Sequence, residues 1–376
     1  MITRRSLLMS AAAAAPGIER QELFTSDTAG YKVYRIPGIV VTGRGTALVY
    51  CEARASDKGD WGTIHILQRR STDGGHTFDA PRRIAEVPGG PHPKNPVALA
   101  QKLADPTDQT YNNAVMIADR INPRMVHMLF NLEYMRAFYQ RSEDEGVTWS
   151  APVDITQAAF EPFRPEYDWK VLGTGPGHGI QLRGGRILVP VWLSTGTGGH
   201  AHRPSVVSTV YSDNNGATWK RGEIAIPNTD EWVNPNETAL VELKGGRVML
   251  NARTESKPGR RLVAVSPDGT RAWSRPEFHD ALADPVCFGS LVRHPRGLLF
   301  VNPDNRVDRA RRNVTVQVSH DEGKTWREKH VLEPGGSGYA DMAVARDGAV
   351  LCLYERNADV NGRWRTQALV LARLKV

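Results

Sequence analysis

The sequence predicts an all-β protein, a six-bladed β-propeller, and three observations lead to this fold class. The 376 residues include 35 glycines and 24 prolines, scattered along the chain as turns between many short strands require. A short turn motif recurs four or five times, which indicates a repeated structural unit. Neither a long amphipathic helical stretch nor an apolar run of transmembrane length is found. A hydrophobic content of 40% supplies ample material for a core.

The first 20 residues are expected to be an export signal that precedes the fold. The segment MITRRSLLMSAAAAAPG joins an arginine pair, a short apolar stretch and small alanines, a layout that resembles a twin-arginine signal. The alternative is a basic N-terminus on a cytoplasmic protein. We therefore expect an exported protein, periplasmic or secreted, whose residues 21–376 form one domain.

The charge of the chain indicates which kinds of ligand it binds, and its cysteine content indicates whether disulfides hold the fold. The net charge of +7 is spread along the chain with no basic arm and no recognition motif, so nucleic-acid binding is not expected. A positive field does favour a small anionic ligand. The three cysteines provide no disulfide framework, and Cys51 and Cys352 stand in strand-like runs as expected core residues.

The repeat itself predicts a hairpin turn. STDGGHTF, SEDEGVTW, SDNNGATW and SHDEGKTW begin at residues 71, 142, 212 and 319, and SPDGTRAW at residue 266 is a degraded copy. Asp or Asn caps backbone amides, Gly takes a positive φ, and the final aromatic residue fills the gap between sheets. Each copy follows a strand-like run and precedes another strand. Four to five marked units predict six blades, at least one of them unmarked.

Three arginines break apolar strand-like runs and are the candidate ligand-binding residues. Arg35 stands in KVYRIPGIV, Arg253 ends VMLNAR, and either Arg311 or Arg312 precedes the strand of the last repeat. A guanidinium drawn towards the interior needs an anionic partner. Because inner strand ends of a propeller converge on its axis, the trio is expected to hold one carboxylate.

These repeats and arginines resemble the sialidase (neuraminidase) family, from about Phe24 to the C-terminus. The resemblance implies a retaining exo-α-sialidase that hydrolyses terminal sialic acid from sialylated glycans, with neither metal nor organic cofactor. It assigns the binding of the sugar carboxylate to Arg35, Arg253 and Arg311. Arg311 is chosen over Arg312 because the family pattern places the arginine two residues before the N-V-T run.

The same resemblance assigns the nucleophile to Tyr339 in GSGYADMAV and its base to Glu237 in VNPNETALVEL. Sialidases are the glycosidases that use tyrosine in place of a carboxylate. The anomeric carbon of sialic acid carries a carboxylate, which would repel an incoming Asp or Glu. A neutral phenol avoids this repulsion, provided that a base takes its proton.

The general acid is expected on a loop near Arg35, within CEARASDKGDWG. Asp60 matches the family's acid/base aspartate, and Asp57 is the second choice. Arg54 is similar to an accessory arginine that contacts the ring-4 substituent of the sugar or steadies the acid. Glu52 is expected to hold one of the arginines.

Other interpretations stay open at this point. His200 and His202 have a ligand-like spacing, but no third ligand stands near them in sequence, so no metal site is predicted. A sialic-acid-binding lectin without turnover is the alternative from another functional class. A trans-sialidase, a sialidase that forms an anhydro product, or a glycosidase for a related nonulosonic acid would keep the same residues.

Overall fold

The computed structural model describes residues 17–360 and 363–376, and in these ranges the chain is built almost entirely of β-strands. The helical segments are short: α1 (Pro96–Ala100), α2 (Thr156–Ala159), η1 (Gly59–Trp61), η2 (Glu161–Phe163) and η3 (Lys244–Gly246). The all-β prediction is confirmed. In the described part of the chain, no helix has the length and apolar character needed to cross a membrane.

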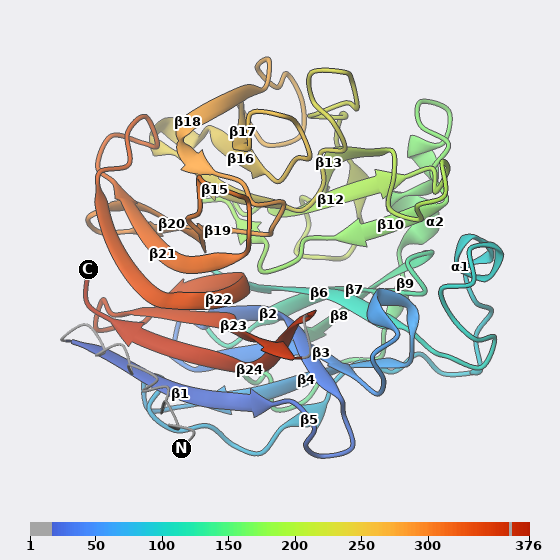
Figure 1. Ribbon diagram of the computed structural model, residues 1–376, viewed down its shortest axis with the longest axis horizontal. Coiled ribbons are helices and arrows are strands. Elements are labelled where there is room, and N and C mark those ends of the chain that lie inside the picture. The colour runs from blue at the N-terminus through green and yellow to red at the C-terminus, as the bar shows by residue number, and fades with distance from the viewer. Residues whose placement is uncertain (1–16, 361–362) are drawn as a thin grey trace, which may run out of the picture.

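The strands form four separate sheets and one larger sheet, all antiparallel and mostly connected in chain order (Figure 1). The first two sheets contain β2 (Val33–Val41), β3 (Ala47–Arg54), β4 (Ile64–Ser71) and β5 (Arg82–Arg83), then β6 (Tyr111–Ala118), β7 (Val126–Leu132), β8 (Arg136–Ser142) and β9 (Val153–Asp154). The next two contain β10 (Val171–Thr174), β11 (Ile180–Gln181), β12 (Ile187–Ser194), β13 (Ser205–Ser212) and β14 (Lys220–Arg221), then β15 (Thr238–Glu242), β16 (Val248–Ala252), β17 (Arg260–Ser266) and β18 (Glu277–Ala283).

The fifth sheet has seven strands and joins the two ends of the chain. Its order is β19 (Ser290–His294), β20 (Gly297–Pro303), β21 (Arg312–Ser319), β22 (Glu328–Val344), β23 (Val350–Val360), β24 (Arg363–Leu374) and β1 (Ile18–Thr25). The first half of β22 pairs with β21 and its second half with β23. Figure 1 shows β1, in blue, beside β24, in red.

The predicted export signal, residues 1–20, falls mostly on residues 1–16, which lie outside the described residues. β1 begins at Ile18, three residues before the domain boundary predicted at residue 21.

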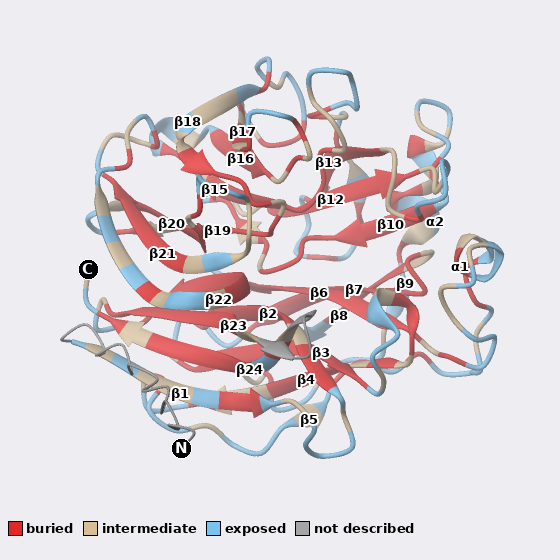
Figure 2. Cartoon of the chain, viewed as in Figure 1, coloured by how far each residue is buried: buried red, intermediate tan, exposed pale blue. Residues whose placement is uncertain are grey.

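The hydrophobic core lies between the faces of successive sheets. One cluster joins β3 to β6 and β7, for example Leu48 with Met128, and the next joins β6 and β7 to β12 and β13. Further clusters continue from β12 to β16, from β16 to β20, and from β20 and β21 to β23 and β24. The last packs β23 and β24 against β2 and β3, for example Leu353 with Ile39. The sheets therefore pack in a closed cycle, with their buried strands shown in red in Figure 2.

The repeated motif forms a hairpin turn, as the sequence predicts, and the structure places it between the third and fourth strand of a sheet. In the first copy, Asp73 Oδ1 accepts hydrogen bonds from the Ser71 hydroxyl at 2.7 Å and from the Thr77 backbone N–H at 2.9 Å. The second and fourth copies repeat these contacts, and Asn214 replaces the aspartate in the third without losing them. Each turn ends in an aromatic residue that packs on the core.

The strand that carries Arg35 contains a β-bulge at Pro37 and Gly38. The β2–β3 register shifts between Arg35 and Gly38, and Ile36 takes a positive φ of 55°. A side chain on Gly38 would clash with the ring of Tyr50. The bulge bends β2 directly after Arg35, which still pairs with Glu52 of β3.

A buried acid joins three elements behind the inner strands. Asp341, on β22, accepts a hydrogen bond from the Ile39 N–H at 2.9 Å with one oxygen, and its other oxygen lies 2.8 Å from His178 Nδ1. Burial lowers the pKa of His178, but Asp341 and the resulting hydrogen bond outweigh it, so the pKa is raised. A raised pKa in the folded state stabilises the fold below the unfolded pKa of histidine, and the stabilisation is lost as pH rises.

We expect His178→Gln to cost stability mainly at low pH. The wild-type advantage in unfolding free energy should be largest near pH 5.5. It should shrink by on the order of 1 kcal/mol as pH rises through the folded-state pKa, because a charge-assisted hydrogen bond is stronger than a neutral one. Urea unfolding at several pH values measures this difference. His320→Gln, at an exposed histidine, is the control, and a wild-type advantage that does not change with pH would contradict the expectation.

Candidate active site

The predicted site residues come together at one end of the sheets. Arg35 lies in β2, Glu237 directly precedes β15, Arg253 follows β16, Arg311 precedes β21 and Tyr339 lies in β22. These five residues and Asp60 line one cavity of about 210 Å³. The seventh predicted residue, Arg54, stands behind Asp60. Segments more than 300 residues apart in sequence thus contribute to a single concave site.

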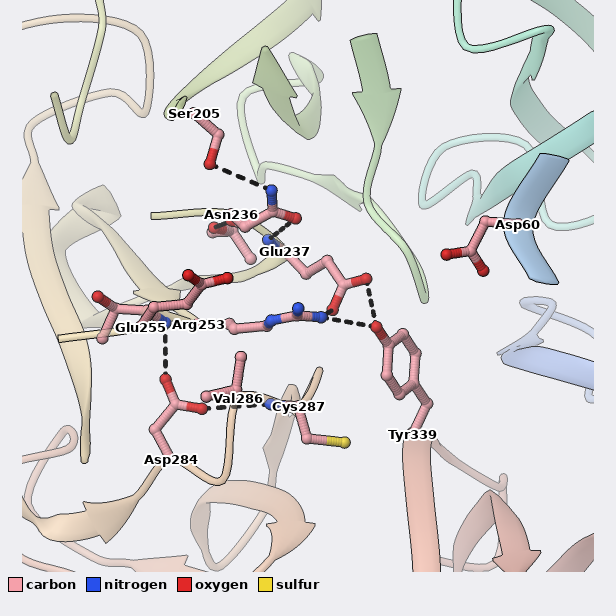
Figure 3. A network of polar contacts seen from close by, with 12 residues as sticks. Asp60, Ser205, Asn236, Glu237, Arg253, Glu255, Asp284, Val286, Cys287 and Tyr339 are labelled. Carbon is pink, nitrogen blue, oxygen red and sulfur yellow. Dashed lines mark hydrogen bonds and ion pairs between the residues drawn. The ribbon is translucent and has the colours of Figure 1, made fainter. Parts of the chain in front are cut away.

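The centre of the site is a triangle of hydrogen bonds among three side chains (Figure 3). The Tyr339 hydroxyl donates to Glu237 Oε1 at 2.6 Å. Arg253 Nη1 donates both to Glu237 Oε2 at 2.6 Å and to the Tyr339 oxygen at 2.7 Å. The phenol therefore has a proton acceptor and a cation at its oxygen, the two partners that a phenolate requires when it forms.

Backbone pairing explains why Glu237 and Arg253 meet although 16 residues separate them. The Arg253 N–H donates to the Glu237 carbonyl at 2.9 Å, and the Asn236 N–H donates to the Arg253 carbonyl at 3.0 Å. These bonds extend the β15–β16 ladder by one residue pair, Glu237 and Arg253. Residues that stand opposite each other in a ladder have their side chains on the same face of the sheet. Asn236 Oδ1 in turn accepts from the Glu237 N–H at 2.9 Å.

Two further arginines cover the ring of Tyr339. The guanidinium carbons of Arg35 and Arg311 lie 5.1 Å and 5.4 Å from its centroid. Tyr339 is only 5% exposed. Burial, aided by Glu237, raises the pKa of its phenol, while Arg253, Arg311 and Arg35 oppose this effect, and the net shift is upward. The hydroxyl is therefore neutral in the free protein at ordinary pH.

Arg35 is held by an acid that the sequence analysis did not single out. Glu355, on β23, is 1% exposed and accepts from Arg35 Nε at 3.1 Å and Arg35 Nη2 at 3.3 Å. It also accepts from the backbone N–H groups of Ile36 and Tyr339, each at 3.1 Å. Glu355 thus fixes the arginine, the bulge and the strand of the phenol at once. Its signal was a charge within the apolar run VLCLYE, the same kind of signal that pointed to Arg35.

Asp60 lies across the cavity from the phenol, in the single turn η1 (Figure 3). Arg54 Nη1 lies 2.8 Å from Asp60 Oδ1, and Arg54 Nη2 bonds Glu52 at 2.7 Å. The expectation that Glu52 holds an arginine is therefore confirmed. Burial raises the pKa of Asp60, but the charges of Arg54 and Arg35 hold it well below its usual range. The Asp60 carboxyl is thus ionised in the free protein.

The two members of each pair of alternatives lie in different surroundings. Arg311 lines the cavity and donates to the Val286 carbonyl, whereas Arg312 points outward and pairs with Asp308 at 3.0 Å, with its side chain 45% exposed. Asp60 lines the cavity, whereas the Asp57 side chain is 68% exposed and lies 3.5 Å from Arg365.

An aromatic wall lies beside Asp60 and was not predicted. The rings of Trp61, Tyr134 and Trp192 surround His202 at centroid distances of 5.5, 5.1 and 5.1 Å. Burial lowers the pKa of His202 to about 4, so its ring is neutral. His200 lies next to it on the same loop. In the described ranges, no group of three or more His, Cys, Asp or Glu side chains is arranged to hold a metal ion.

Comparisons with known proteins agree with this arrangement. Residues 100–352 match the family model described as a BNR repeat-like domain. A sialidase of Micromonospora viridifaciens is 30% identical over 383 residues, covering 93% of this chain but only 54% of that relative. The chain thus spans about half the length of this curated relative.

Solved structures show likeness in fold. A Hadza microbial sialidase superposes with a TM-score of 0.77 at 23% identity, covering 95% of this chain and 68% of the other. An intramolecular trans-sialidase from Ruminococcus gnavus superposes with a TM-score of 0.75 at 17% identity, covering 95% and 97%. The relatives confirm the resemblance to sialidases that the sequence motifs indicated.

Proposed function

This chain belongs to the BNR repeat-like domain family, and on that premise we propose that it is a retaining exo-α-sialidase acting on sialylated glycans. The observation that carries the proposal is the Tyr339 hydroxyl, which lies 2.6 Å from Glu237 and accepts a hydrogen bond from Arg253, while Arg35 and Arg311 lie over its ring. Three arginines around one small cavity suit a carboxylate. A phenol with its own base suits attack on a carbon that already bears that carboxylate.

In the proposed reaction, Arg35, Arg253 and Arg311 bind the carboxylate of the sugar and present its anomeric carbon to Tyr339. Glu237 takes the phenolic proton while the phenolate oxygen bonds to the anomeric carbon. The bond to the leaving oxygen breaks, and Asp60 gives that oxygen a proton. Water, deprotonated by Asp60, then attacks the anomeric carbon, the bond to the Tyr339 oxygen breaks, and Glu237 returns its proton to that oxygen, with net retention of configuration.

The substrate itself supplies a reason for Asp60 to gain its proton. In the free protein, Arg35 Nη1 lies 4.0 Å from Asp60 Oδ1 and favours its ionised form. A sugar carboxylate bound to Arg35 would offset that positive charge and exclude water from the cavity. Both changes raise the pKa of an adjacent carboxyl. Asp60 would therefore be protonated only where a leaving group is present to receive the proton.

We also propose the finer architecture and location. The closed cycle of packed sheets, with β22 shared between two four-stranded units, supports a six-bladed β-propeller. The unit made of the second half of β22, β23, β24 and β1 would be the blade without a repeat motif. The arginine pair and alanines of residues 1–20 support export, which signal-peptide processing in a bacterial host would test.

The proposal is tested by following the first sugar released from methylumbelliferyl sialic acid by proton NMR. We expect α-sialic acid to appear first and then to mutarotate to the β anomer. Initial release of the β anomer would contradict the tyrosyl intermediate. Binding without release would favour the lectin. An anhydro sugar, or transfer of the sialic acid to another sugar, would show that the reaction is not hydrolysis.

A further inference from the structure

We propose that Asp284, a buried residue outside the cavity, is a positioning residue that sets the spacing of Arg253 and Arg311, so that both guanidinium groups meet one carboxylate. Asp284 directly follows β18, its side chain is fully buried, and it lines no part of the site cavity. It therefore acts on the substrate only through other residues. The inference rests on the proposed function, because the carboxylate in question is that of the sugar.

One oxygen of Asp284 holds the backbone next to Arg253. Asp284 Oδ2 accepts a hydrogen bond from the Thr254 N–H at 2.7 Å, and Thr254 directly follows Arg253. Among the residues that the structure describes, Arg253 Nε has no hydrogen-bond partner, and other side chains hold this guanidinium only through Nη1. The direction in which Arg253 projects therefore depends on the position of its backbone, which Asp284 helps to fix.

The other oxygen of Asp284 closes the turn that holds Arg311. Asp284 Oδ1 accepts from the Cys287 N–H at 3.3 Å (Figure 3). Inside this turn, Val286 takes a positive φ of 55°, a costly conformation for a β-branched residue, and its carbonyl accepts a hydrogen bond from Arg311. Strain of this kind persists only where the surrounding structure enforces it. Here the bond from Cys287 to Asp284 spans the strained residue and enforces it.

A buried cation connects this turn to the strand of Arg253. Arg261, on β17, is fully buried and lies 3.7 Å from Asp284 Oδ1. It donates to the Cys287 carbonyl at 2.8 Å, and to Asn251 of β16 at 2.6 Å on the side chain and 3.0 Å on the carbonyl. Desolvation offsets much of the attraction in a buried ion pair, but these directed bonds still fix the turn relative to β16. Asp284 and Arg261 thus form one brace behind the two arginines.

The spacing that this brace sets matters for binding a carboxylate. Hydrogen bonds from guanidinium groups to a carboxylate are directional, and a small misplacement of binding groups can cost up to about 10²-fold in rate. Without Asp284, Arg253 and Arg311 would still supply their positive charge to the cavity. Their spacing would vary, however, and each would meet the carboxylate less often in the correct geometry.

Two variants remove the constraint in different ways. Asp284→Asn keeps the size of the side chain and removes the charge that faces Arg261. Val286→Gly keeps every polar contact of the turn but accepts a positive φ without strain, so the carbonyl that holds Arg311 becomes less restrained. The test uses calorimetry on the full-length protein to measure the Kd of a 2,3-unsaturated analogue of sialic acid, and steady-state kinetics on sialyl-lactose.

We expect Kd and KM to rise by at least about tenfold in Asp284→Asn and by at least about threefold in Val286→Gly, with a smaller change in kcat, because the carboxylate is bound in the ground state and the transition state alike. Asp119→Asn is the matched control. Asp119 is also buried and accepts from the backbone N–H groups of Ile121 and Asn122, each at 2.7 Å, but does not line the cavity. It should lose stability and keep Kd within about twofold.

Wild-type affinity in Asp284→Asn, or an equal loss of affinity in Asp119→Asn, would overturn the inference. If Asp284→Asn does not fold, Val286→Gly decides, and wild-type affinity in that variant would overturn it. Because Kd is measured without turnover, a wild type that binds the analogue but releases no sialic acid would overturn only the proposed hydrolysis. A wild type that does not bind the analogue would overturn both.

Discussion

Tyr339→Phe is expected to lower kcat on an unactivated sialoside by about 10³-fold or more, the scale of losses seen when a nucleophile is removed. The variant keeps the ring beneath Arg35 and Arg311 and removes only the oxygen that lies 2.6 Å from Glu237. Without that oxygen no covalent bond to the anomeric carbon can form. Steady-state kinetics on sialyl-lactose, with mass spectrometry after incubation with a fluorinated sialic acid, measures both the rate and the intermediate.

Binding should survive in this variant, because the three arginines remain in place. A sialic acid analogue should therefore bind Tyr339→Phe with an affinity within about tenfold of the wild type, although Arg253 loses one acceptor. Tyr354→Phe, in the core cluster between β21 and β23, is the matched control and should retain full activity. Wild-type turnover by Tyr339→Phe would refute the nucleophile assignment, and loss of folding would be seen in its circular dichroism.

Arg311→Ala is expected to lower kcat/KM by about 10²-fold, equivalent to about 2.7 kcal/mol. Arg311 lines the cavity and forms no ion pair with the residues that the structure describes, so the sugar carboxylate would be its first ionic partner. Truncating one member of a desolvated charge pair carries a cost of this size. Most of the loss should appear in KM, since the carboxylate is bound in the ground state and the transition state alike.

The neighbouring arginine provides the control for this prediction. Arg312 pairs with Asp308 at the surface, with 45% and 50% of the two side chains exposed, and exposed ion pairs contribute little. Arg312→Ala should therefore change kcat/KM by less than about threefold. A larger loss in Arg312→Ala than in Arg311→Ala would reverse the assignment of the third arginine.

Several elements of this protein could be predicted from short stretches of sequence. The repeated turns depend on contacts within eight residues, such as those of Asp73 with Ser71 and Thr77, so their residues are sufficient to define them. The bulge after Arg35 follows from Pro37 and Gly38 in a strand of β-branched residues. The separation of Glu237 from Arg253 fits a hairpin, which the backbone bonds between them form.

The contacts that define the site depend on residues far apart in the chain. Glu355 reaches Arg35 across 320 positions, and the aromatic wall around His202 collects rings from three sheets and their loops. The choice between Arg311 and Arg312 turns on which side of one strand end faces the cavity. None of these relations has a local pattern, because each arises from the way the sheets pack around a common site.

The sequence by itself determined the strand and turn repeat, the family resemblance and the residues that could carry the chemistry, since each is encoded in local spacing and residue type. Only the tertiary structure decided which acid holds which arginine and which of the candidate side chains line one cavity. The strength of an ion pair depends on the distance between its charges and on their burial. Both are set only when the chain has folded and its first and last strands lie side by side.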